Sequence, residues 1–143
     1  MFKTIVVAVD GSPSSDRALE YGVNLAKENS SHLVLAHVTE LIAGRGAGTV
    51  HLEEDDLVNR LRDRAGELAQ NGLPSTEFKV TRTMSGGPAH ALAEIAAEAN
   101  ADLVVTGTRG HTALTGLVVG SVAQRMMHVA PCPVLVVPAP REG

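Results

Sequence analysis

The chain has 143 residues, which suits a single domain over residues 1–143 that buries roughly 68–70% of its unfolded surface. Its net charge of −4 argues against broad electrostatic binding to nucleic acid, because such binding needs a basic face. Phe2, Tyr21 and Phe78 are the only Phe, Tyr or Trp residues, so a base-stacking platform for single-stranded nucleic acid is excluded as well.

Two further features concern the compartment. Cys132 is the only cysteine, so an internal disulfide is impossible and a reducing compartment fits. The apolar run IVVAV near the N-terminus is too short for a secretory signal, and no stretch approaches the length of a membrane span. We therefore expect a cytoplasmic protein that does not enter a membrane.

The first part of the chain predicts a buried strand followed by a helix. Residues 3–9 (KTIVVAV) form a β-branched apolar run of the kind that is buried on both faces of a sheet. Ser12 is a good helix N-cap and Pro13 suits the first helical position. Apolar and small residues then recur at helical spacing up to about Asn29, so this helix should pack on the sheet.

A second strand, a loop and a second helix are predicted next. Residues 32–38 (HLVLAHV) read as another buried strand, and the three glycines within 41–52 indicate a mobile loop. The acids at 53–56 suit the N-terminus of a helix, where the dipole favours negative charge, and Asn71-Gly72 ends its apolar stripe. This loop directly follows the second strand and is a candidate lid.

The second half repeats the same alternation. Residues 77–83 alternate apolar and polar side chains, as expected near a sheet edge, and a helix follows Gly86-Gly87-Pro88. Residues 102–106 and 134–137 read as the fourth and fifth strands. Between them Val119, Val122, Ala123, Met126 and Ala130 mark the apolar side of a fourth helix, and Met127 is assigned to the core with Met126. Five strands alternating with four helices predict a parallel, doubly wound α/β sheet.

Glycines gather between the fourth strand and the fourth helix, within GTRGHTALTGLVVGS. Each glycine alone is explained by a turn or by close packing, but the set places Gly120-Ser121 at a helix start, where free N–H groups and the positive dipole end favour an anion. A Walker A loop is excluded because no lysine stands in such a loop, and the first strand-to-helix turn, DGSPSS, lacks the dinucleotide-binding pattern.

The spacing Gly107, Gly110, Gly120-Ser121 resembles the signature of the nucleotide-binding universal stress proteins: Gly, two residues, Gly, nine residues, Gly-Ser or Gly-Thr. The similarity extends over the chain, from IVVAVDGSPSS through LAHV to HVAPCPVLVV. It implies the strand order 3-2-1-4-5, with a ligand where the winding reverses, between the first and fourth strands. Asp10 and Gly107 end those two strands.

The resemblance also implies an ATP-like pose. Ala8, Val9, Asp10 and Val38 would line the adenosine end, with the Val38 backbone reading the adenine edge. Gly107 and Arg109 would lie near the ribose and phosphates. The phosphates would be bound by Gly110, Gly120, Ser121 and Val122. Mg²⁺ is plausible beside a triphosphate, although no acidic cage is visible and metal ligands remain unassigned.

Several residues keep two interpretations. Asp10 is either a solvated turn residue or a ligand contact, and Arg109 is either an exposed loop charge or a phosphate contact. The six histidines are scattered without metal-ligand spacing, so a zinc site is not predicted. Cys132, between two prolines, is predicted to be buried and inert.

The leading functional hypothesis is an ATP-binding stress-response or signalling module. The alternative is a slow ATP hydrolase or nucleotide transferase on the same fold, since no residue clearly positions a water molecule for rapid hydrolysis. The resemblance further implies a homodimer formed by residues 134–137, an uncharged apolar edge strand.

Overall fold

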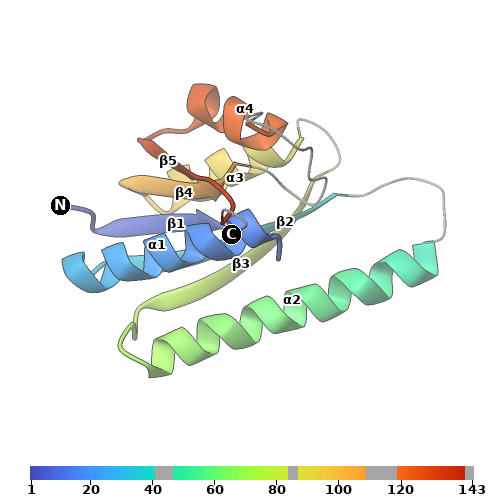
Figure 1. Cartoon of the computed structure of the whole chain (residues 1–143), viewed down its shortest axis with the longest axis horizontal. Helices are drawn as coiled ribbons and strands as arrows, with labels where there is room; N and C mark the ends of the chain where they lie inside the picture. Colours follow the sequence, from blue (N-terminus) through green and yellow to red (C-terminus); the bar gives the residue numbers. More distant parts are fainter. Residues whose placement is uncertain (41–46, 84–86, 109–118, 141–143) are drawn as a thin grey trace.

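The computed structural model describes residues 1–40, 47–83, 87–108 and 119–140, and these form one α/β domain (Figure 1). Its elements alternate strictly between strand and helix, in agreement with the sequence. In chain order they are β1 (Thr4–Ala8), α1 (Pro13–Asn29), β2 (His32–Glu40), α2 (Ala47–Gln70), β3 (Thr76–Thr83), α3 (Gly87–Glu98), β4 (Leu103–Gly107), α4 (Ser121–Val129) and β5 (Val134–Val137).

The five strands form one parallel sheet in the order β3-β2-β1-β4-β5. This confirms the predicted fold class and strand order. The three central strands carry the continuous apolar runs because both of their faces are covered by helices. The alternating strand β3 lies at one edge and β5 at the other.

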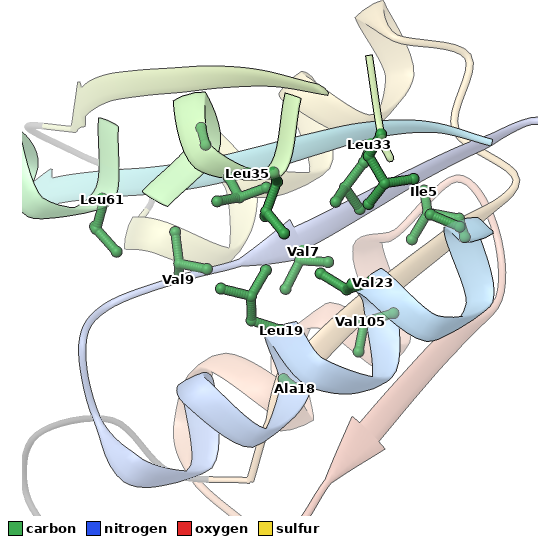
Figure 2. Packing of buried hydrophobic residues seen from close by; sticks show 14 of the residues in the cluster. Ile5, Val7, Val9, Ala18, Leu19, Val23, Leu33, Leu35, Leu61 and Val105 are labelled. Carbon is green, nitrogen blue, oxygen red and sulfur yellow. The ribbon is translucent and has the colours of Figure 1, made fainter. Parts of the chain in front are cut away.

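Alternate residues of the central strands supply two separate cores, and Figure 2 shows the one that faces α1 and α2. Ile5 and Val7 of β1 pack with α1 and α2, as do Leu33 and Leu35 of β2. The intervening residues, such as Val6 and Val34, pack with α3 and α4 instead. Each fully buried Val or Leu contributes about 1.5–3 kcal/mol relative to an exposed one. The pleat of the sheet thus decides which helices each strand residue meets.

The start of α1 follows the predicted signals. Ser12 is the N-cap, and its side-chain oxygen accepts a hydrogen bond from the N–H of Ser15 at 3.3 Å. Pro13 occupies the first helical position. The helix ends at Asn29, where Ser30 adopts a left-handed conformation and closes the last turn.

The boundary of α2 differs from the prediction. The helix begins at Ala47, so residues 47–52 are helical and the acids at 53–56 lie beyond its first turn. One glycine inside a helix costs only about 1 kcal/mol relative to alanine, and lengthening an existing helix is favourable, so Gly48 does not stop it. The remainder of the predicted loop, residues 41–46, lies outside the described residues.

The second correction concerns α4. Met126 is fully buried, as predicted, whereas the side chain of Met127 is 57% exposed. Successive helical residues lie about 100° apart around the axis, so one face cannot bury both methionines. No helix in the described part of the chain is long and apolar enough to cross a membrane.

Candidate nucleotide site at the switch point

The turn between β1 and α1 is held by its serines. The N–H of Asp10 donates to Oγ of Ser15 at 2.9 Å, and Oδ1 of Asp10 accepts from the N–H of Ser12 at 2.8 Å. Gly11 has a φ of +80°, and a Cβ there would approach Leu57 Cδ1 of α2 at 2.8 Å. Asp10 is therefore half-buried in a turn of fixed shape, at the carboxyl end of β1.

Negative charge gathers at this turn. Burial and, to a lesser extent, the nearby Asp10 carboxylate raise the pKa of Asp16, while Arg60 and Arg64 of α2 act in the opposite direction. A phosphate placed directly against these two acids would be repelled.

Gly107, which ends β4, lies against the first turn of α1. A Cβ on Gly107 would stand 2.5 Å from Oγ of Ser14 and 2.7 Å from its backbone carbonyl carbon. A backbone atom cannot move aside as a flexible side chain does. The structure thus gives Gly107 a packing role between β4 and α1, and its predicted contact with a nucleotide stays a prediction.

The two ends of the glycine-rich segment meet. The N–H of Gly120 donates to the carbonyl oxygen of Thr108 at 2.5 Å, and the N–H of Thr108 donates to Val137 of β5 at 2.9 Å. This bond brings the start of α4 to the carboxyl end of β4. Because the first N–H groups of a helix have no intrahelical acceptor, Ser121 and Val122 present donors at the carboxyl end of β4.

The N-cap of α4 is suited to receiving a ligand group. Gly120 is the cap residue and supplies no side-chain hydrogen bond, since it has no side chain. Ser121 is exposed and Val122 is half-buried. The remaining predicted phosphate-binding residues, Arg109 and Gly110, lie outside the described residues.

The predicted adenosine residues separate between the two faces of the sheet. Ala8 and Val38 are partly buried against the core under α3 and α4, together with Val122 of α4. The side chain of Val9 is buried on the opposite face, among α1 and α2 (Figure 2). The fold therefore brings Ala8, Val38 and Val122 to one side of the sheet, and Val9 could reach a ligand on that side only through its backbone.

The backbone of Val38 has a defined direction. The β1–β2 ladder ends with the Ala8–Ala36 pair and a bond from the N–H of Val9 to the carbonyl of Ala36 at 2.9 Å. In a strand, every second residue directs its N–H and C=O to the same neighbour, so Val38 faces the same side as Ala36. That side is where β1 has ended.

A polar cluster beside this point was missed by the sequence analysis. Nδ1 of His37 lies 2.7 Å from the carbonyl oxygen of Val9, and Nε2 lies 2.5 Å from Oε1 of Glu54 on α2. The hydroxyl of Thr39 donates to the same Glu54 oxygen at 2.9 Å. The histidine is buried, with 4% of its surface exposed. Its partners are distant in sequence, so spacing alone could not reveal the cluster.

Two other features of the described residues bear on ligand binding. Among the described residues, no group of three or more His, Cys, Asp or Glu side chains is arranged to hold a metal ion. A groove of about 660 Å³ runs between β3 and α3, lined by residues 78–83 and by His90, Ala91, Glu94, Ile95 and Glu98. It follows the sheet edge, and β2 separates it from β1.

The fold is that of a doubly wound α/β protein whose strand order reverses between β1 and β4, the place where open α/β sheets bind their ligands. Residues 1–138 match the model of the Universal stress protein family. The chain belongs to the universal stress protein family.

Relatives with this name span almost the whole chain. A universal stress protein of Thermus aquaticus is 36% identical, with 96% of this chain and 99% of the relative covered. The universal stress protein YxiE of Bacillus subtilis is 31% identical, again with 96% and 99% covered. A solved universal stress protein in complex with cAMP has a TM-score of 0.72 and 28% identity, covering 95% of this chain and 97% of that one.

Proposed function

We propose that this chain binds an adenine nucleotide, with ATP as the expected ligand, at the switch point between β1 and β4. The observation that carries the proposal is the bond from Gly120 to Thr108, which sets the start of α4 against the end of β4. Backbone N–H groups at a helix start, beside a glycine and next to a strand end, are suited to phosphate oxygens. The neighbouring structure solved with cAMP supports an adenine ligand.

The geometry divides the ligand between two groups of residues. Val38 directs its backbone toward the end of β1, where the edge of a planar base would find a donor and an acceptor. Ser121 and Val122 present their N–H groups where phosphates would lie, and Arg109 and Gly110 belong to the same proposal. Mg²⁺ would arrive with the triphosphate, its coordination completed by water and phosphate oxygens.

The proposed role is a binding module whose nucleotide changes conformation or partner choice. Rapid hydrolysis requires a group that positions water and, in general, a cation against the developing charge. Asp10 lies at the nucleoside end and has one carboxylate oxygen engaged by Ser12. We therefore expect ATP affinity with slow turnover or none.

The test is calorimetry with ATP on the natural chain and on Gly120→Val. Gly120 has a φ of −62° and a ψ of 160°, which any residue adopts, so the substitution adds no backbone strain while its side chain obstructs the phosphate site. We expect binding to be lost while the chain stays folded, with the thermal unfolding temperature lowered only slightly because valine is a poorer N-cap than glycine.

Gly66→Val is the matched control, because a Cβ at Gly66 on α2 meets nothing within 4 Å. It should bind ATP like the natural chain. Undiminished ATP binding by Gly120→Val would rule out this phosphate site, and brisk steady-state hydrolysis by the natural chain would rule out the role of a binding module.

A further inference from the structure

We propose that His37, held by Glu54, is a positioning residue that keeps the backbone of Val38 available for a base. This inference rests on the proposed nucleotide site, although its structural half can be tested without any ligand. The carbonyl group involved is that of Val9, which directly follows β1 and accepts a hydrogen bond from His37.

The first step concerns the hydrogen on the imidazole. A carbonyl oxygen can only accept, so Nδ1 of His37, 2.7 Å from the Val9 oxygen, must carry the hydrogen and donate it. The other ring nitrogen faces Oε1 of Glu54 at 2.5 Å, so one proton lies between them. Glu54 thus fixes the orientation of the ring, and Thr39 fixes Glu54.

The Val9 carbonyl does not accept a hydrogen bond from the N–H of Val38. In an uninterrupted parallel ladder the next bond after Val9–Ala36 would run from the N–H of Val38 to the Val9 oxygen. The paired register instead stops at Ala8–Ala36, and no such bond joins these two described residues. The imidazole has taken the place of the Val38 N–H as the donor to that carbonyl.

This arrangement leaves the N–H of Val38 available to a ligand. The imidazole of His37 approaches from the face of the sheet that carries α1 and α2, whereas the side chain of Val38 lies on the other face. The carbonyl of Val9 is therefore satisfied without occupying the N–H of Val38. That N–H remains directed past the end of β1, where the edge of a base can bond to it.

Because Glu54 belongs to α2, this arrangement also joins the helix to the base-binding end. A displacement of α2 would release the ring, and the Val9 carbonyl would then be free to accept from Val38. The N–H of Val38 would then form one additional hydrogen bond of the β1–β2 ladder and would no longer be available to a base. His37 therefore sets base affinity through the backbone, without touching the base.

The experiment compares His37→Phe with the natural chain by amide hydrogen exchange in the absence of nucleotide. Removing the imidazole donor leaves the Val9 carbonyl to pair with Val38, so we expect the Val38 amide to exchange roughly 5-fold more slowly than in the natural chain. His37→Asn keeps an N–H near the position of Nδ1 and should restore the natural rate.

Binding measurements complete the test. His37→Phe should weaken the affinity for ATP by roughly 3- to 10-fold, because the base loses its hydrogen bond with the Val38 N–H. The affinity for inorganic tripolyphosphate should be unchanged. His32→Phe is the matched control. It removes a second His–Glu pair, His32–Glu77 at 3.0 Å, from the far end of the same strand.

Each outcome is decisive. Unchanged exchange at Val38 in His37→Phe, or the same change in His32→Phe, would overturn the inference. If the natural chain binds no adenine nucleotide, the proposed function fails, and the exchange measurement still decides whether His37 positions Val38. If His37→Phe does not fold, Glu54→Ala, at a half-buried position of α2, serves instead with effects in the same direction.

Discussion

At the end of β4, the residue Gly107 is required to be a glycine by packing alone. Gly107 was singled out for a predicted phosphate motif, yet a side chain there would collide with the backbone of Ser14 on α1. A variant at Gly107 therefore reports on folding before it reports on binding. This distinguishes it from Gly120, whose substitution is expected to spare the fold.

We expect Gly107→Ala to lower the free energy of unfolding by about 1–3 kcal/mol, because overpacking against a fixed backbone forces β4 and α1 apart. Denaturation with urea measures the change. Gly66→Ala, in open space within α2, should instead stabilise by about 0.5–1 kcal/mol. Equal midpoints for Gly107→Ala and the natural chain would contradict the packing role.

Cys132 presents a second question at this scale. The residue is only partly buried, against the core beneath α3 and α4, so the prediction of a buried cysteine was wrong. Burial, and in smaller part the carboxylate of Asp102, raise the pKa of its thiol. Since the thiolate is the reactive form, the raised pKa disfavours chemistry at this cysteine, and the inert role stays a prediction.

We expect the Cys132 thiol of the folded chain to react with iodoacetamide at neutral pH more slowly than the thiol of the urea-unfolded chain. Asp102→Asn removes one cause of the raised pKa and should increase the rate in the folded protein. A folded-state rate equal to that of the unfolded chain would contradict this account.

At the scale of elements, α4 shows where helical period decides burial. Met126 points into the core and Met127 points to solvent, although both are equally apolar. The sequence pattern that marked Val122, Ala123 and Met126 already defined one face. Met127 lies outside that face because neighbouring helical residues are rotated by about 100° around the axis.

We expect Met126→Ala to cost about 2–5 kcal/mol of unfolding free energy, because it leaves a cavity in a closed core. Met127→Ala should change it by no more than about 0.5 kcal/mol. Thermal unfolding of the two variants, side by side, gives the comparison. A similar loss in both would mean that Met127 is covered in solution, as it would be by a bound partner.

At the scale of the whole molecule, the sheet has two unlike edges. Strand β3 alternates polar and apolar residues, with Lys79 and Arg82 among them, whereas β5 reads VLVV and carries no charge. Charged side chains discourage edge-to-edge pairing, and an apolar, uncharged edge favours it. The difference supports the proposal of a homodimer formed through β5.

We expect the natural chain to sediment as a dimer and Val136→Lys to sediment as a monomer or a weakened dimer. Val136 belongs to neither core cluster, so the substitution should leave the protomer folded. Val80→Lys, on the exposed β3 edge, is the control and should remain dimeric. A well-folded natural monomer at micromolar concentration would refute the proposal.

The sequence by itself determined the class of fold. Continuous apolar runs, the Ser12–Pro13 start of α1 and the alternation of strand and helix are local signals, carried by residues within one or two turns of each other. The family resemblance added the strand order, and the structure confirmed it. The sequence alone therefore indicates that Asp10 follows β1, that Gly107 ends β4 and that Gly120 precedes α4.

Only the tertiary structure decided which residues from distant segments contact each other, because sequence periodicity reports on local structure alone. Glu54 was read as an acid that suits a helix start, but α2 begins at Ala47, and Glu54 instead reaches His37 on β2. The packing of Gly107 on Ser14 and the separation of Val9 from Val38 also depend on contacts between distant segments. Such contacts arise when the sheet closes and its pleat assigns each side chain to a face, so they follow from the assembled fold and cannot be read from neighbouring residues.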